Sequence, residues 1–290
     1  MAKGDGIKPE RRFRVPVIIA ILLAVVVVGA AGGFLILNLV KPGPAAQMAS
    51  PLPVKPKLSY TTETITLMGG TPFETPAYLL SSTSKDKSPK VFVLGGVHGD
   101  EPAGYTSAGK LTAAKVSKGT LIVIPRANQV AINKGTREGT TDLNRCFPGD
   151  INGTNENKLA AEIFGVARDK GANLDLNLHG ATGFYLEDNS HWGQTIIFDF
   201  PESRALPDRV VAEVNQGIAV PYEKFSVLIY PIEKCMSYLT YQLLHIPAYG
   251  IEVPSIMGLS KGVYYHLRVV QQFCEDVGVK VDNWSEILAP

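Results

Sequence analysis

Cysteine is scarce in this sequence, with only Cys146, Cys235 and Cys274 among 290 residues. Their wide spacing contains no CxxC metal motif, and an odd number cannot complete a disulfide framework, so we expect buried free thiols. Charge is also sparse, at 19% of residues against 45% hydrophobic. This composition excludes a disordered or collagen-like chain and permits one large domain or two small ones.

No strong excess of either charge marks the whole chain, whose formal net charge is +1. The balance is uneven along the sequence, because residues 60–290 carry 20 Lys and Arg against 25 Asp and Glu, whereas the amino terminus is cationic. A mildly acidic body is a poor match for the phosphate backbone of DNA or RNA. We therefore expect no nucleic acid partner.

One segment lacks charged and polar side chains altogether, the run of 21 residues from 17 to 37. A run of this length can cross a bilayer core as a helix, so we predict a membrane-spanning signal anchor over residues 15–40. Residues 1–14 are basic, which places the amino terminus in the cytoplasm and the body outside it, in the periplasm or at the cell surface. Cleavage as a signal peptide near Ala45, Ala46 or Ala49 is the alternative, and it also exports the body.

The segment after this run has little periodicity. Five prolines lie between residues 41 and 57, a composition typical of a semi-extended tether. We therefore assign residues 41–59 to a linker and residues 60–290 to one folded domain.

Short apolar runs alternate with helical periodicity in this domain. Residues 91–97 and 121–125 are nearly continuous apolar runs, as expected for strands covered on both faces. Further strands are expected at residues 173–178, 195–200 and 246–253, and helices at 101–116, 156–168, 204–215, 234–244 and 262–275. The alternation predicts an α/β domain with a mostly parallel, doubly wound mixed sheet, whose ligands lie beyond the carboxyl ends of the strands.

Side chains that ligate metals follow two of these strands. His98 and Glu101 come directly after residues 91–97, and His179 ends the run 173–178. Two His and one Glu form an established protein ligand set for catalytic zinc, which leaves the fourth position to water. Each block alone also fits a capping or packing role, but their common place at one sheet edge favours a single zinc ion per chain.

Two loops are rich in polar side chains. Residues 135–149 contain Arg137, Arg145, an asparagine and four Gly or Pro residues. Arginine suits bidentate recognition of a carboxylate, and near a metal it can polarise a carbonyl oxygen. A solvated loop with surface arginines fits the composition equally well. His191 lies in a second polar loop and could line a pocket.

The order of these blocks resembles the zinc carboxypeptidase superfamily. The similar set consists of His98-x-x-Glu101, Arg137, Asp142-Leu143-Asn144-Arg145-x-Phe147-Pro148-Gly149, His179 and Glu252. The contexts HGDEPAG and FPGD are most similar to the branch of succinylglutamate desuccinylase and aspartoacylase, together with bacterial peptidoglycan-peptide amidases and carboxypeptidases. The resemblance covers residues 90–255.

This resemblance implies roles around the metal. It implies that His98, Glu101 and His179 hold zinc. It also implies that Asp142 accepts a hydrogen bond from a zinc-bound imidazole and so fixes its tautomer. Glu252, after an apolar strand, stands where the family has its general base.

The resemblance also implies how the substrate is held. Arg137 would polarise the carbonyl, while Asn144 and Arg145 would clamp a substrate carboxylate. Tyr230 stands upstream of Glu252, where carboxypeptidases place a tyrosine over the substrate, and Tyr238 and Tyr241 are alternatives for this role.

Two departures from the family pattern leave the branch open. Gln129 follows Asn128 where the family commonly has proline, and Asn177 stands where it often has Asp, although Asp175 lies on the same strand face. We expect a zinc-dependent hydrolase that cleaves an amide bond next to a substrate carboxylate, foremost an extracytoplasmic carboxypeptidase or amidase on cell-wall peptides. A deacylase of N-acyl amino acids and a non-catalytic, membrane-anchored binding module are the alternatives.

Overall fold

The computed structural model describes residues 59–83 and 85–290. The predicted anchor and all but the last residue of the predicted linker lie outside these ranges, so both stay predictions. Within the described ranges, no helix combines the length and apolar character needed to cross a membrane.

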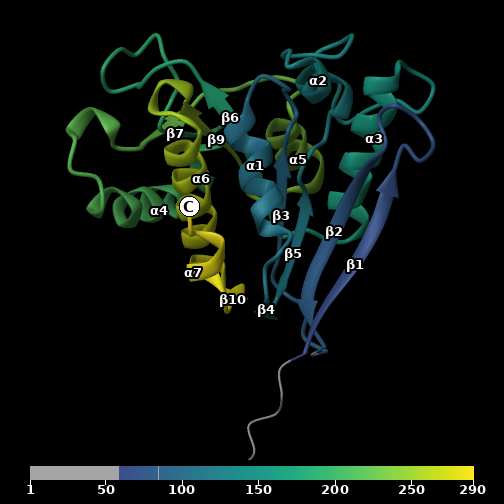
Figure 1. Ribbon diagram of the computed structural model, residues 1–290, viewed down its shortest axis with the longest axis horizontal. Coiled ribbons are helices and arrows are strands. Elements are labelled where there is room, and N and C mark those ends of the chain that lie inside the picture. Colours follow the sequence, from purple (N-terminus) through teal and green to yellow (C-terminus); the bar gives the residue numbers. More distant parts are fainter. Residues whose placement is uncertain (1–58, 84) are drawn as a thin grey trace, which may run out of the picture. The chain divides into compact units, whose positions relative to one another are not determined.

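An eight-stranded mixed sheet forms the centre of the domain, in the order β1-β2-β5-β3-β6-β9-β7-β8 (Figure 1). Its strands are β1 (Tyr60–Leu67), β2 (Thr75–Ser82), β3 (Lys90–Gly95), β5 (Thr120–Ile124), β6 (Leu174–Ala181), β7 (Thr195–Phe198), β8 (Ser226–Ile229) and β9 (Ala248–Pro254). The central strands β5, β3, β6 and β9 are parallel, as is the pair β7 and β8. The predicted α/β fold with a mostly parallel mixed sheet is therefore confirmed.

Helices cover both faces of the sheet. One face packs against α1 (Pro102–Leu111), α4 (Ala205–Gln216), α6 (Leu259–Val277) and α7 (Trp284–Ile287), and the other against α3 (Asn155–Asp169) and α5 (Met236–Leu244). The sequence of strand β3 is apolar because both of its faces are buried. Val91 and Val93 pack into the core on the α1 and α6 side, whereas Phe92 and Leu94 pack into the core on the α3 and α5 side, because successive side chains point to opposite faces.

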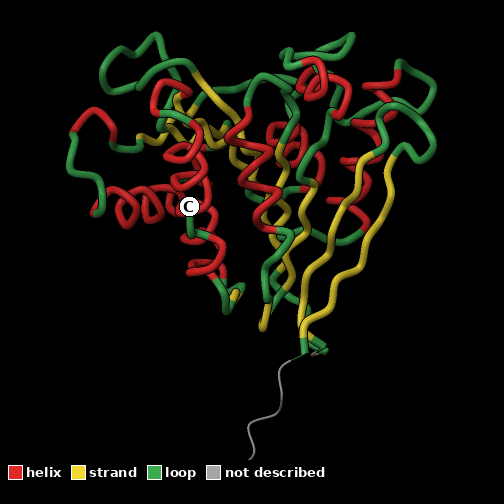
Figure 2. The backbone as a smooth tube through the Cα atoms, in the orientation of Figure 1, coloured by secondary structure: helices red, strands yellow, loops and turns green. Residues whose placement is uncertain are grey.

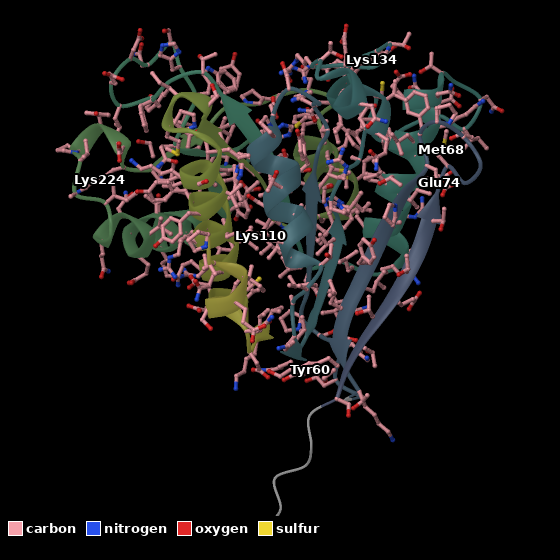
Figure 3. The ribbon with its side chains drawn as sticks, viewed as in Figure 1. Tyr60, Met68, Glu74, Lys110, Lys134 and Lys224 are labelled. Carbon is pink, nitrogen blue, oxygen red and sulfur yellow. The ribbon has the colours of Figure 1, made fainter. Side chains whose placement is uncertain are left out.

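Several parts of the domain differ from the expectation or were missed. The helix expected over residues 101–116 ends at Leu111, because Val116–Lys118 forms β4 and pairs with β10 (Lys280–Val281). Strands β1, β2 and β8 were not predicted. Strand β1 is largely exposed and rich in threonine, so it lacks the apolar run of a buried strand. Tyr60, labelled in Figure 3, begins β1, and its hydroxyl donates a hydrogen bond to Asp282 (2.9 Å).

The loops that follow the parallel strands gather at the end of the sheet where α2 (Gln129–Lys134) lies (Figure 2). The three cysteines are buried free thiols, as predicted. Because the thiols are buried, the candidate reactive side chains are those in the loops at this end of the sheet.

Candidate active site

The parallel register brings the predicted residues to one edge. His179 in β6 is paired directly with Glu252 in β9, so the two side chains project from neighbouring strands on the same face. His98 and Glu101 lie in the short segment between the end of β3 and the start of α1. Since β3 is the other neighbour of β6, all four residues meet at the carboxyl ends of adjacent strands.

A close approach between α1 and β6 sets the position of Glu101. A Cβ atom on Gly104, in the first turns of α1, would lie only 2.4 Å from the carbonyl oxygen of Leu178. Only glycine lets the helix lie this near the strand. Glu101, just before α1, is thereby held beside His179, which follows Leu178.

Three side chains form a compact ligand set. The Nδ1 atom of His98 lies 2.6 Å from Oε1 of Glu101, and Nδ1 of His179 lies 3.0 Å from Oε2 of the same carboxylate. One donor atom from each residue lies within 4.8 Å of the others. Ligand atoms about 2 Å from one ion are separated by roughly 3 to 4 Å, so the spacing and the donor types fit zinc.

Charged neighbours surround this set. Asp142 Oδ1 is 3.2 Å from Nε2 of His98, and Arg137 lies 3.4 Å from both Glu101 and Asp142. Burial alone would lower the pKa of His98, but the two carboxylates outweigh it and raise that pKa to about 9. Burial would likewise raise the pKa of Glu101, yet the two histidines hold it well below its usual range. Glu101 is therefore anionic at any working pH.

Glu252 has the opposite electrostatic setting. It lies in the same cleft without a direct cationic partner among the described residues, and burial raises its pKa to about 7. A carboxylate with such a pKa can both accept and release a proton near neutral pH. This is the property that a general base in hydrolysis needs.

The loop after α2 presents the predicted clamp. Asn144 and Arg145 lie in a short 3-10 helix, Leu143–Arg145, whose first turn is capped by the Asp142 carboxylate accepting from the Asn144 amide (2.8 Å). Arg145 is exposed, whereas Asn144 is buried and, within the described part of the chain, its Oδ1 has no hydrogen-bond partner. A buried amide left open in this way is suited to a ligand.

A cleft of about 660 Å³ is lined by most of the predicted residues, whereas His179 lines a smaller neighbouring recess. The cleft is lined by His98, Glu101, Arg137, Asn144, Arg145, Tyr230 and Glu252. Tyr230 is 52% exposed at the cleft, while the hydroxyl of the alternative Tyr241 is bound to Glu202. Asp142 does not line the cleft and instead contacts His98.

Two cleft residues come from the loop after β6. Trp192 was not predicted, and its ring lies 4.9 Å from that of Tyr230. His191, which the sequence marked only as a possible pocket residue, lines the same cleft and lies 2.9 Å from the Thr182 hydroxyl. The polar sequence of this loop indicated that it could line a pocket. Its position beside the cleft depends on the tertiary structure, which the local sequence does not contain.

Comparisons with known proteins agree with this fold and with the family resemblance. Residues 87–194 match the family described as Succinylglutamate desuccinylase/Aspartoacylase catalytic domain. The N-alpha-acetyl-L-2,4-diaminobutyric acid deacetylase of Halomonas elongata is 37% identical over 149 residues, 48% of this chain and 40% of that protein. These matches confirm the family resemblance indicated by the motifs.

Solved structures share the fold. The mDAP-bound form of Helicobacter pylori Csd4, a D,L-carboxypeptidase, superposes with a TM-score of 0.64 at 20% identity, over 70% of this chain and 54% of that chain. An aspartoacylase family protein from Mesorhizobium loti gives a TM-score of 0.56 at 17% identity, over 78% of this chain and 68% of that chain. The match thus spans 40% of the length of the deacetylase and 54% of that of Csd4.

Proposed function

We propose that this protein is a zinc-dependent hydrolase that cleaves an amide bond next to a substrate carboxylate. One observation carries the proposal, namely that His98 and Glu101 of the compact ligand set line one cleft together with Glu252 and Arg145. His179, the third member of the set, lines a smaller neighbouring recess that Glu252 also borders. The ligand set would hold zinc, which when bound supplies Lewis-acid activation of water and of a carbonyl group.

The chain's own residues account for the proton transfers. Glu252 would accept a proton from the attacking water and deliver it to the leaving amine, consistent with its pKa of about 7. Arg137 would donate a hydrogen bond to the carbonyl oxygen as negative charge develops there. Its half-exposed guanidinium is anchored by Glu101 and Asp142, which supports a fixed orientation toward the cleft.

Substrate selection would begin with a carboxylate. Arg145 at the mouth of the cleft can form a bidentate pair, and the open Oδ1 of Asn144 can accept a hydrogen bond from a nearby substrate N–H. This arrangement suits a carboxyl-terminal residue of a peptide or a free N-acyl amino acid.

The favoured substrate is a cell-wall peptide processed outside the cytoplasm. Support comes from the fold shared with Csd4 and from the apolar run at residues 17–37, which would export the body. An N-acyl amino acid deacylase is the second candidate, favoured by the 37% identity to a deacetylase. Under either function the metal and the roles of the cleft residues are the same.

Hydrolysis assays on the zinc-loaded full-length chain test the proposal. Release of a free amino acid from muropeptides would identify the first activity, and release from N-acyl amino acids the second. Glu252→Gln keeps the side-chain shape but removes the base, so it should retain zinc and lower turnover by about 10²- to 10⁴-fold. Zinc binding without hydrolysis of either class would instead favour a binding module, and unchanged turnover in Glu252→Gln would refute the assigned base.

A further inference from the structure

A narrow recess extends from the main cleft along one face of the sheet. Its volume is about 30 Å³ against about 660 Å³ for the cleft, and Asn144, Tyr230 and Glu252 line both. The small volume favours a slim, unbranched side chain over a ring. The recess therefore begins where the substrate carboxylate and the scissile bond would lie.

The strand pattern explains the path of this recess. Tyr249 and Ile251 of β9 enter the core on the α1 and α6 side, so Ala248, Gly250 and Glu252 face the opposite side, toward α5. Small residues at the first two of these positions leave the sheet face open below Glu252. The helix side of the recess is formed by residues at the start of α5, Ser237 and Tyr238.

Asp199 brings a carboxylate to this recess. Ile197 of β7 is paired with Gly250 and faces the recess, and Asp199, which directly follows the last residue of β7, lines the same recess. It is therefore displaced from Glu252 toward Ala248, the deep end. Its side chain is partly buried and makes no ion pair with any described residue.

The charges along the substrate path are segregated. The recess is lined by two carboxylates, Asp199 and Glu252, and by no Lys or Arg within the described residues, whereas the mouth carries Arg145. Partial burial, and after it the negative charge of Glu202, raise the pKa of Asp199 above its usual value. His179 lines the recess only at the end near the metal ligands, so away from that end a further negative charge would be repelled by Asp199 and a cation would be attracted.

We propose that this recess binds the side chain of the amino acid whose carboxylate Arg145 holds, and that Asp199 selects an unbranched side chain ending in an ammonium group. This inference rests on the proposed function and narrows its substrate class. Arg145 and Asp199 would grip the two ends of one residue, an α-carboxylate at the mouth and a terminal cation at depth. Substrates with acidic side chains would be rejected by the same charge pattern.

A side-chain series tests the assignment on the zinc-loaded full-length chain. The probes are N-acetyl and N-acetyl-alanyl derivatives of lysine, norleucine and glutamate, in both enantiomers, with calorimetric binding of the free amino acids as a second readout. Lysine should exceed norleucine by about tenfold or more in kcat/KM and in affinity, and glutamate should be poorest. Asp199→Asn should bring lysine down to the norleucine level without changing norleucine. Asp208→Asn, an exposed acid on α4, is the matched control and should leave the series unchanged.

A second variant tests the position of the recess. A Cβ atom on Gly250 would lie 3.9 Å from the Ile197 carbonyl oxygen, an ordinary contact, so Gly250→Ala should fold normally while narrowing the recess. The affinity and kcat/KM for the lysine and norleucine derivatives should both decrease, whereas those for the corresponding alanine derivative, whose side chain is too short to enter the recess, should not. Equal affinity for lysine and norleucine, or a lysine preference that survives Asp199→Asn, would overturn the inference while hydrolysis continued. If no derivative were hydrolysed, the proposed function would lose support, and the binding series would still decide the role of Asp199.

Discussion

Two glutamates in the same cleft show how surroundings set chemistry at the scale of single residues. Glu101 lies against His98 and His179, which hold its pKa well below the usual range. Glu252 meets no such pair of contacts, and burial raises its pKa to about 7. A carboxylate that stays anionic suits a metal ligand, and one that titrates near neutral pH suits a general base. The same side chain can therefore serve as a ligand at Glu101 and as a base at Glu252.

Arg145 gives the first prediction at this scale. Arg145→Ala should weaken hydrolysis of substrates with a free carboxylate by about 10- to 100-fold, because a bidentate charged pair is lost, while their carboxamides should change little. Comparing kcat/KM for each acid with its amide checks this. Arg145→Lys, which keeps the charge without the planar fork, should recover only part of the loss. An equal decrease on acids and amides would argue against the clamp.

Asp175 gives a second prediction, for protein stability. It is fully buried in β6, where burial raises its pKa to about 7, and its Oδ1 accepts a hydrogen bond from Asn177 (3.0 Å). The folded protein therefore retains a proton that the unfolded chain loses near pH 4, so this stabilising contribution is complete below about pH 4 and is lost as pH rises through about 7.

Asp175→Asn cannot titrate, so its stability relative to the parent should increase between about pH 5 and about pH 8 by on the order of 2 to 3 kcal/mol. Urea unfolding of both proteins across this range measures the effect. The exposed Asp208→Asn serves as control and should show no such trend. A stability difference between Asp175→Asn and the parent that does not depend on pH would contradict a buried, protonated Asp175.

Packing of α1 on β6 links elements to the site. Gly104→Ala would place Cβ 2.4 Å from the Leu178 carbonyl oxygen, so α1 must move away from β6 and carry Glu101 from His179. We expect a stability loss of about 1 to 3 kcal/mol and weaker zinc binding. Chemical unfolding and zinc titration check both effects.

Gly109 in the same helix provides the matched control. A Cβ there would meet nothing within 4 Å, so Gly109→Ala should be neutral or stabilise by up to about 1 kcal/mol. Similar losses of stability and zinc affinity in both variants would show that the close approach of α1 to β6 at Gly104 does not position Glu101.

The described elements also show where sequence reasoning succeeds. Strands β3 and β5 were predicted because each is a nearly continuous apolar run buried on both faces. Strands β6 and β9 were predicted from apolar residues at alternate positions. Strand β1 was missed because solvent covers most of it, so its threonine-rich sequence lacks that signal. The end of α1 was misplaced because Val116 joins β10, a long-range pairing that local periodicity does not contain.

The same distinction applies to the site within the whole molecule. His98 and Glu101 were identifiable because they follow β3, and His179 because it lies near the carboxyl end of β6, at the same edge of the sheet. Trp192 and the recess position of Asp199 were not, since a loop and a short strand reach the cleft only through the tertiary arrangement of β7 beside β9. Local sequence thus predicts residues at strand ends better than residues that close a pocket from outside.

Zinc content of the purified full-length chain tests the central claim most directly. Elemental analysis of the parent should find about one zinc per chain, and His179→Ala should lose most of it because only two ligands remain. Bound zinc should also raise the unfolding temperature of the parent but not of the variant. A folded, zinc-supplemented parent without metal, or a variant that retains it fully, would contradict the account.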